Sequence, residues 1–71
     1  MNNDNVFKIS LKAARVNANL SQEQLAKILG VSKTTVNKWE NAKTSISASQ
    51  FQKLSALAGV PQDYIFCPVV N

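Results

Sequence analysis

Four polar side chains fall on one face of a short stretch of the chain. Spacings of one, three and four residues place them on a common helical arc, and they are Lys33, Thr34, Asn37 and Lys38. Val36 and Trp39 fall on the opposite side, which predicts that this other side is buried. Lysine can donate to guanine O6 and N7, asparagine can address adenine N6 and N7, and threonine offers a hydroxyl and a methyl group. These residue types suit a helix that reads base edges in a DNA major groove, although taken alone they also fit an ordinary solvated helix face.

The residues just before this face predict a second helix and a tight turn. Ser21 can cap its start by accepting a bond from a free backbone N–H, and Gln24 completes a capping box. Its buried face is expected to contain Leu25, Ala26 and Leu29. Gly30 suits the left-handed conformation that ends a helix, and Ser32 caps the next one. We therefore expect a helix-turn-helix element over about residues 21–41.

Apolar spacing predicts three further helices. The first is expected over residues 6–18, ending at Asn19, with one face formed by Phe7, Leu11, Ala14 and Ala18. After a polar turn at residues 44–47, the next helix ends at Gly59 and has a core face of Phe51, Leu54, Leu57 and Ala58. Pro61 suits the first position of a last helix, over residues 61–66. No strand is expected. The fold class is predicted to be all-α, a compact five-helix bundle forming a single domain over residues 1–71.

The composition argues against an enzyme. The chain has no histidine and one cysteine, Cys67, so neither a Cys–His nucleophile pair nor a zinc site can be built. We expect no catalytic residue, no metal, no cofactor and no small-molecule substrate. No apolar run approaches the roughly 20 residues that cross a bilayer, and the N-terminus lacks the pattern of a signal peptide. A cytoplasmic, reducing location is expected for the chain.

Basic residues are concentrated in the first part of the chain. Eight Lys and Arg oppose four Asp and Glu, for a net charge of +4. Seven of the eight lie no later than position 43: Lys8, Lys12, Arg15, Lys27, Lys33, Lys38 and Lys43. The charge alone fits either an anionic partner or general solubility. The regular placement of three of these lysines around the expected recognition helix favours an anionic partner.

Several landmarks together resemble one known family. The order and spacing of Arg15, LSQEQLAKILGVS, VNKWEN and LSALAGVPQDYIF resemble the Cro/phage-repressor (XRE) family of bacterial and phage regulators, over about residues 7–66. The resemblance implies a lambda-repressor-like domain that binds a two-fold DNA operator through its third helix. It also implies a homodimer that regulates transcription. Repression by promoter occlusion is favoured over activation, because little surface is left for recruiting polymerase.

The resemblance also implies roles for particular residues. Lys33, Thr34 and Lys38 match base-facing positions, and Asn37 lies on the same arc. DNA backbone contacts are implied for Gln22, Thr35, Asn41, Lys43 and Thr44, although Thr35 could instead face the turn. The family usually has glycine where this chain has Ala42. If that residue must adopt a positive φ, its Cβ costs on the order of 1 kcal/mol, unless Asn41 takes the role.

Other implied roles are structural. Arg15 and Glu40 match a partly buried ion pair that orients the third helix, whereas two unrelated surface residues would contribute little. Trp39 is expected in the core rather than stacked on a base. After the fourth helix, an apolar segment is expected either to cap the core or to form a dimer contact, through Tyr64, Ile65, Phe66, Val69 and Val70.

Two alternatives remain open. The same fold could act as an antitoxin or another protein-binding module whose main partner is a protein, although Lys33 and Lys38 argue against that reading. The chain could also be the DNA-binding portion of a larger regulator.

Overall fold

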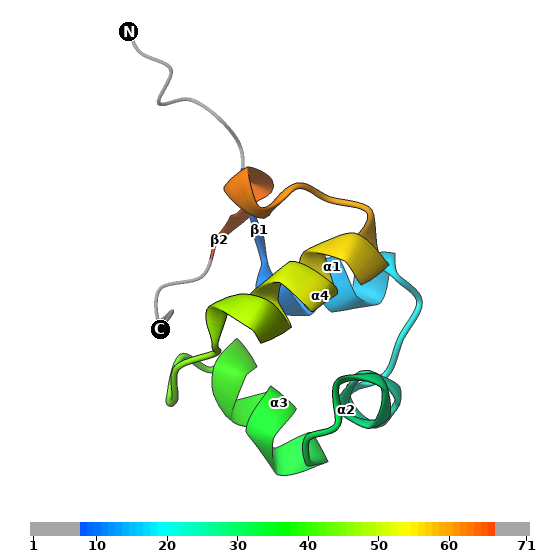
Figure 1. Cartoon of the computed structure of the whole chain (residues 1–71), viewed down its shortest axis with the longest axis vertical. Helices are drawn as coiled ribbons and strands as arrows, with labels where there is room; N and C mark the ends of the chain where they lie inside the picture. The colour runs from blue at the N-terminus through cyan, green and yellow to red at the C-terminus, as the bar shows by residue number, and fades with distance from the viewer. Residues whose placement is uncertain (1–7, 67–71) are drawn as a thin grey trace, which may run out of the picture.

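A computed structural model describes residues 8–66 of the chain, which form four α-helices and one small sheet (Figure 1). In chain order the elements are β1 (Ile9–Ser10), α1 (Leu11–Asn17), α2 (Gln22–Leu29), α3 (Lys33–Glu40), α4 (Ala48–Ala58), a 3₁₀ turn (Gln62–Tyr64) and β2 (Ile65–Phe66). The expected helix-turn-helix corresponds to α2 and α3, with α4 packed on α1.

A serine caps the start of each α-helix. In every case its hydroxyl accepts a bond from the backbone N–H three residues later, and the caps are Ser10, Ser21, Ser32 and Ser47. Gln24 completes the capping box of α2 by accepting from the backbone N–H of Ser21 at 2.8 Å. Gly30 and Gly59 end α2 and α4 with positive φ values of 72° and 69°. The predicted cap and stop of α2, the predicted cap of α3 and the predicted stop of α4 are therefore confirmed.

The first and last predicted helices are wrong in extent. The first begins at Leu11 rather than near residue 6, because Ser10 caps it and the preceding residues pair as a strand. Ile9 aligns with Ile65, and Ser10 with Phe66, in a parallel pair. The predicted last helix is one 3₁₀ turn followed by β2. Residues 8–66 therefore hold four α-helices rather than five, and the prediction of no strand is also wrong. Phe7 lies outside the described residues.

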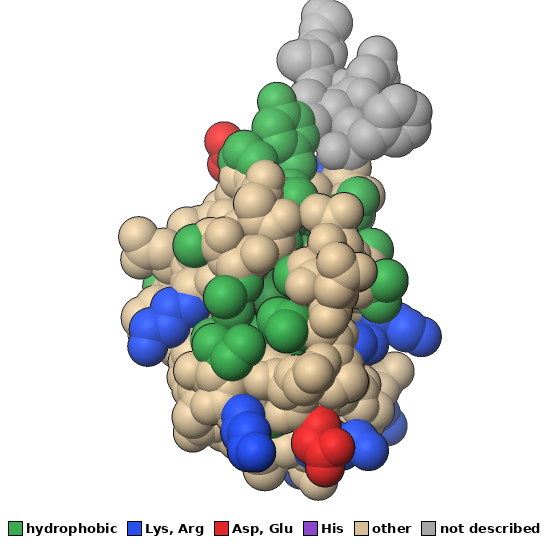
Figure 2. Space-filling view, turned by 90° about the vertical axis from the view of Figure 1, so that its right-hand side faces the viewer, with side chains coloured by type: hydrophobic (Ala, Val, Ile, Leu, Met, Phe, Trp, Pro, Cys, Tyr) green, Lys and Arg blue, Asp and Glu red, His purple; other side chains and the backbone are tan. Residues whose placement is uncertain are grey.

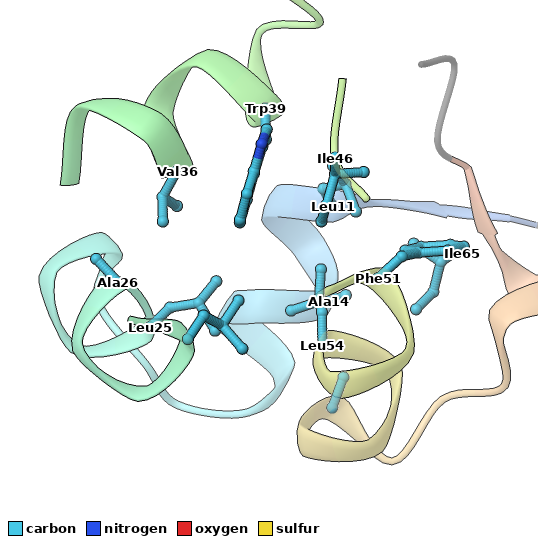
Figure 3. Packing of buried hydrophobic residues seen from close by; sticks show 12 residues of the cluster. Leu11, Ala14, Leu25, Ala26, Val36, Trp39, Ile46, Phe51, Leu54 and Ile65 are labelled. Atoms are coloured by element: carbon cyan, nitrogen blue, oxygen red, sulfur yellow. The ribbon is translucent and has the colours of Figure 1, made fainter. Parts of the chain in front are cut away.

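The core lies where the four α-helices meet (Figure 3). Val36 points from α3 toward Leu25 and Ala26 of α2, and both Val36 and Leu25 are fully buried. The small side chain at Ala26 lets these two helices approach closely. The other buried apolar residues are Leu11, Ala14, Leu29, Trp39, Ile46, Phe51, Leu54, Ala58 and Ile65.

Three residues depart from the expected core, and one of them is Ala18, the C-cap of α1, which is only half-buried. Ile46, in the predicted polar turn, is only 1% exposed and packs with the core beside Leu11 (Figure 3). Leu57 is 38% exposed, so its prediction as a core residue is wrong. On α4 the buried stripe is taken by Leu54 and Ala58, which are four residues apart, and Leu57 falls at its edge. No helix within residues 8–66 has the length and apolar character needed to span a bilayer.

Candidate nucleic-acid interface

Two large side chains anchor α3 to the rest of the domain. Val36 is 0% and Trp39 is 7% exposed. The indole Nε1 of Trp39 donates to the backbone oxygen of Ser45 at 3.2 Å, which ties the segment that follows α3 to the core. Trp39 is therefore a core residue, as expected, and its ring is not available to stack on a base.

The four side chains expected to face bases are all exposed on the other side of α3: Lys33, Thr34, Asn37 and Lys38. Two ammonium groups, a hydroxyl and an amide are thus presented together at the surface of one eight-residue helix. This set can donate to and accept from base edges, and its positive charge suits a polyanion.

Thr35 lies between the exposed and buried sides of α3. It is half-buried, and its Oγ1 is 3.0 Å from the Oγ of Ser32, the N-cap of the same helix. The backbone N–H of Thr35 also donates to that Oγ at 3.1 Å. Of the two alternatives left open for Thr35, this geometry matches a side chain directed at the turn.

Asn37 is held by a neighbour one turn later. The amide Nδ2 of Asn41 donates to the backbone oxygen of Asn37 at 2.9 Å and to its Oδ1 at 3.2 Å. Asn37 Oδ1 keeps a second lone pair, and its own Nδ2 makes no hydrogen bond within residues 8–66. The pair of amides therefore orients Asn37 while leaving it able to donate and accept outward.

An ion pair joins α1 to the end of α3. Arg15 Nε donates to Glu40 Oε2 at 2.6 Å, and its Nη2 donates to Glu40 Oε1 at 3.3 Å. The third contact of the guanidinium is a 2.8 Å bond from Nη1 to the backbone oxygen of Leu20, just before α2. The two charged side chains are only 10% and 6% exposed. The structure thus brings the predicted partners together, and the bidentate geometry constrains the orientation of α3.

Gln22 joins the same cluster from the start of α2. Its Nε2 donates to Glu40 Oε1 at 2.9 Å, and the side chain is half-buried. This bond was not anticipated from the sequence, because residue spacing does not show that Gln22 and Glu40 meet. The expected contact of Gln22 with DNA stays a prediction.

The segment after α3 turns back tightly. Lys43 N donates to the backbone oxygen of Lys38 at 2.8 Å, and Ala42 N donates to that of Trp39 at 3.1 Å. Ala42 has φ 56°, whereas Asn41 has φ −100°. The left-handed position therefore falls on the alanine and not on its asparagine neighbour. Lys43 and Thr44 are exposed beyond this turn, at the end of α3.

The predicted dimer residues separate into two groups. Tyr64 and Phe66 are 46% and 54% exposed, whereas Ile65 is 3% exposed and belongs to the core. Ile65 therefore caps the core, which was one of the two alternatives considered. Val69 and Val70 lie outside the described residues. Within residues 8–66, no three His, Cys, Asp or Glu side chains gather as a set of metal ligands.

Comparisons with known proteins agree with this architecture. The sequence profile of the helix-turn-helix family matches residues 11–65. A similar solved structure is that of the hypothetical transcription factor NHTF from Neisseria, with a TM-score of 0.67 and 33% identity. The match covers 82% of this chain and 65% of that chain, so this chain spans less than two thirds of the neighbour's length. No curated protein matches the chain.

Proposed function

Because this chain belongs to the helix-turn-helix family of the Cro/C1 (XRE) type, we propose that it binds a specific duplex DNA site and regulates transcription. The observation that carries the proposal is that α3 has one buried side and one exposed polar side. Val36 and Trp39 hold one side in the core, and the opposite side exposes two lysines and two neutral hydrogen-bonding groups. A helix so placed can enter a major groove without unfolding any part of the domain.

The proposal assigns different roles to two parts of this surface. Lys33, Thr34, Asn37 and Lys38 read base edges, because they lie on the exposed arc of the helix itself. Contacts to the sugar-phosphate backbone come from residues at the margins, which are Gln22, Asn41, Lys43 and Thr44, whereas Thr35 faces the turn. Those margin contacts set the register and orientation of the domain on the duplex but carry no sequence information.

We also propose that the operator is two-fold and that a homodimer binds it. One eight-residue helix makes few base contacts, so a single domain would bind mainly through phosphates and weakly. Two copies address half-sites about 34 Å apart and double the number of base contacts. The exposed aromatic side chains of Tyr64 and Phe66 support a contact between copies. A regulator of this kind represses by covering a promoter.

Selection from a pool of random duplexes tests the proposal. The purified chain is incubated with the pool, and bound duplexes are recovered and sequenced over several rounds. We expect a two-fold symmetric consensus with half-sites about one helical turn apart. A matched selection with the Thr34→Ala/Lys38→Ala variant should lose the consensus at one or two positions of each half-site. No enrichment by the unaltered chain, or the same consensus from both proteins, would overturn the assignment.

A further inference from the structure

A second surface of the domain is apolar and lies away from the exposed arc of α3. Ile28 on α2 and Leu57 on α4 are 52% and 38% exposed, and they border a groove of about 320 Å³ between the two helices. Leu29 and Ala56 complete the apolar lining, and Lys53 is the charged residue that lines it. Figure 2 shows a hollowed cluster of hydrophobic side chains on this face, with basic side chains around it and an acidic side chain below it. Exposed apolar surface that is contiguous and rimmed by polar groups is typical of an interaction site.

The charge at the rim limits what can occupy this groove. Lys53 lines it, and Lys27 precedes Ile28 on α2; neither lysine forms an ion pair with any residue of the described part of the chain. An occupant that buries Ile28 and Leu57 would bring its own flanking groups close to the ammonium group of Lys53, which lines the groove. Carboxylates at those flanks would be attracted, and further cations would be repelled.

This chain cannot itself supply such an occupant. Its four acidic residues are Asp4, Glu23, Glu40 and Asp63. Glu40 is held by Arg15, and no two of the others lie within ten residues of each other in the sequence. A second copy packed about a two-fold axis through the groove would also place lysines against lysines. The charge pattern therefore favours another protein.

The shape of the groove favours a helix over an extended segment. Both walls are helices, α2 and α4, so no unpaired strand edge is present there to bond with an extended backbone. A helix satisfies its own backbone groups and can place apolar side chains at i, i+3 or i+4, and i+7 into a groove.

We propose that the groove between α2 and α4 docks an acidic amphipathic helix of a partner protein. The site is separate from the DNA-reading face, so a partner and a duplex can be bound together. It gives this regulator a means of recruiting, or being controlled by, a protein whose docking segment combines leucine-like anchors with Asp and Glu.

Binding of designed peptides to the nitrogen-15-labelled chain tests this. The probe is a peptide of about 16 residues with Leu at i, i+3 or i+4, and i+7 and Glu elsewhere on the helix. One control peptide replaces each Glu by Lys, and another replaces each Leu by Ala. We expect the Glu–Leu peptide to bind with a Kd below about 1 mM and to shift amide signals around Ile28, Lys53 and Leu57. Neither control peptide should do so at that concentration.

Protein variants locate the effect. Ile28→Gln and Leu57→Gln should each weaken peptide binding at least about tenfold, since each removes an exposed anchor contact. Val16→Gln is the matched control, because Val16 on α1 is apolar and 55% exposed but does not line the groove. Lys53→Glu alters only an exposed side chain, so it keeps the test decisive if a groove variant is unstable. Lys53→Glu should lower the affinity for the Glu–Leu peptide and raise the affinity for the peptide that carries Lys.

Three outcomes would overturn the proposal. Equal affinities for the Glu and Lys peptides would show that the groove does not select an acidic partner. Shifts centred on residues 33–38 that disappear when duplex DNA is added would show that the peptide only mimics a polyanion at α3. Concentration-dependent shifts at Ile28 and Leu57 without peptide, abolished by Ile28→Gln, would identify a second copy as the occupant. None of these results depends on whether the chain recognises a specific operator.

Discussion

Glu40 accepts hydrogen bonds from two side chains that belong to two other helices. Arg15 reaches it from α1 and Gln22 from α2, while Glu40 itself ends α3. The carboxylate therefore links α1, α2 and α3, and so helps to set the position of the exposed face of α3 that we propose reads DNA. Because Arg15 neutralises it, the end of α3 does not present an unpaired negative charge to an anionic partner.

Removing this carboxylate should destabilise the domain strongly. In Glu40→Ala the guanidinium of Arg15 stays largely buried and loses its counter-charge, and Gln22 loses its acceptor. We expect the free energy of unfolding to fall by about 3–5 kcal/mol, measured by urea denaturation at low temperature. Glu23→Ala is the control, since Glu23 is an exposed carboxylate, and it should change stability by less than about 0.5 kcal/mol.

Replacing both members of the pair keeps this test interpretable if Glu40→Ala does not fold. The double variant Arg15→Met/Glu40→Met removes both charges, so it should be more stable than the single variant. If Glu40→Ala and Glu23→Ala lowered the free energy of unfolding equally, the Arg15–Glu40 pair would stabilise the domain no more than a surface contact does.

Ala42 is the residue at which a substitution should stabilise the fold. Its φ of 56° is costly for a residue with a Cβ, and glycine removes that cost while adding some entropy to the unfolded chain. The net expectation for Ala42→Gly is a gain of about 0.5–1 kcal/mol in the free energy of unfolding. Ala13→Gly, at an exposed position inside α1, should instead lose up to about 1 kcal/mol. Destabilisation by both changes would contradict the left-handed conformation at Ala42.

At the residue scale, the sequence predicts what depends on local spacing and on the family pattern. The arc of Lys33, Thr34 and Lys38 follows from helical periodicity, and the meeting of Arg15 with Glu40 follows from the resemblance. Ile46 was missed because it is a single apolar residue among polar neighbours and forms no periodic pattern. The Gln22–Glu40 bond depends on how α2 crosses α3, which residue spacing alone does not specify.

At the scale of elements, α3 and the turn after it should contribute differently to DNA binding. Lys38 lies on the exposed arc, whereas Lys43 follows the turn. We expect Lys38→Ala to cost about 1–3 kcal/mol on the selected operator and to relax preference at one position of each half-site. Lys43→Ala should weaken binding to all duplexes alike and reduce the slope of log affinity against log salt by about one.

Fluorescence anisotropy at several salt concentrations separates these two effects. Lys53→Ala is the control, because it removes an exposed lysine that lines the groove on α4, and it should leave both the preference and the slope unchanged. If Lys38→Ala weakened binding to all duplexes by the same factor, Lys38 would belong to the residues that contact the DNA backbone and not to those that read bases.

The most predictable features of the fold were the helix boundaries that depend on capping and stop residues near them in the sequence. The serine caps and the glycine stops act within one turn, so both ends of α2, the start of α3 and the C-terminal end of α4 could be assigned from neighbouring residues. The pairing of β1 with β2 could not, because each strand has two residues, too few to show a period of two. That pairing, between the two ends of the described chain, also shortens the first expected helix and limits the last one to a single turn.

At the scale of the whole molecule, self-association should depend on the exposed aromatic residues near β2. Tyr64→Ser/Phe66→Ser removes two side chains that are about half exposed, so the domain should keep its fold. Sedimentation equilibrium with the operator present should then show one copy bound where the unaltered chain binds as two. Affinity for a single half-site should not change. Val16→Ser is the matched control, since it removes an equally exposed apolar side chain on α1.

Two results would contradict the proposed contact between copies through Tyr64 and Phe66. If the aromatic double variant still bound the full operator as a dimer, the contact would have to lie elsewhere on the molecule. Loss of half-site binding by this variant would instead mean that the segment near β2 supports the DNA-reading face itself.

The most direct test of α3 as the DNA-reading helix is to map the bound duplex on the surface of the domain. Amide signals of the nitrogen-15-labelled chain are followed while the selected operator duplex is added. We predict the largest shifts at residues 33–38 and at Lys43 and Thr44, with little change around Ile28 and Leu57. Large shifts at the groove or near β2, with residues 33–38 unaffected, would contradict the assignment of α3 as the helix that reads DNA.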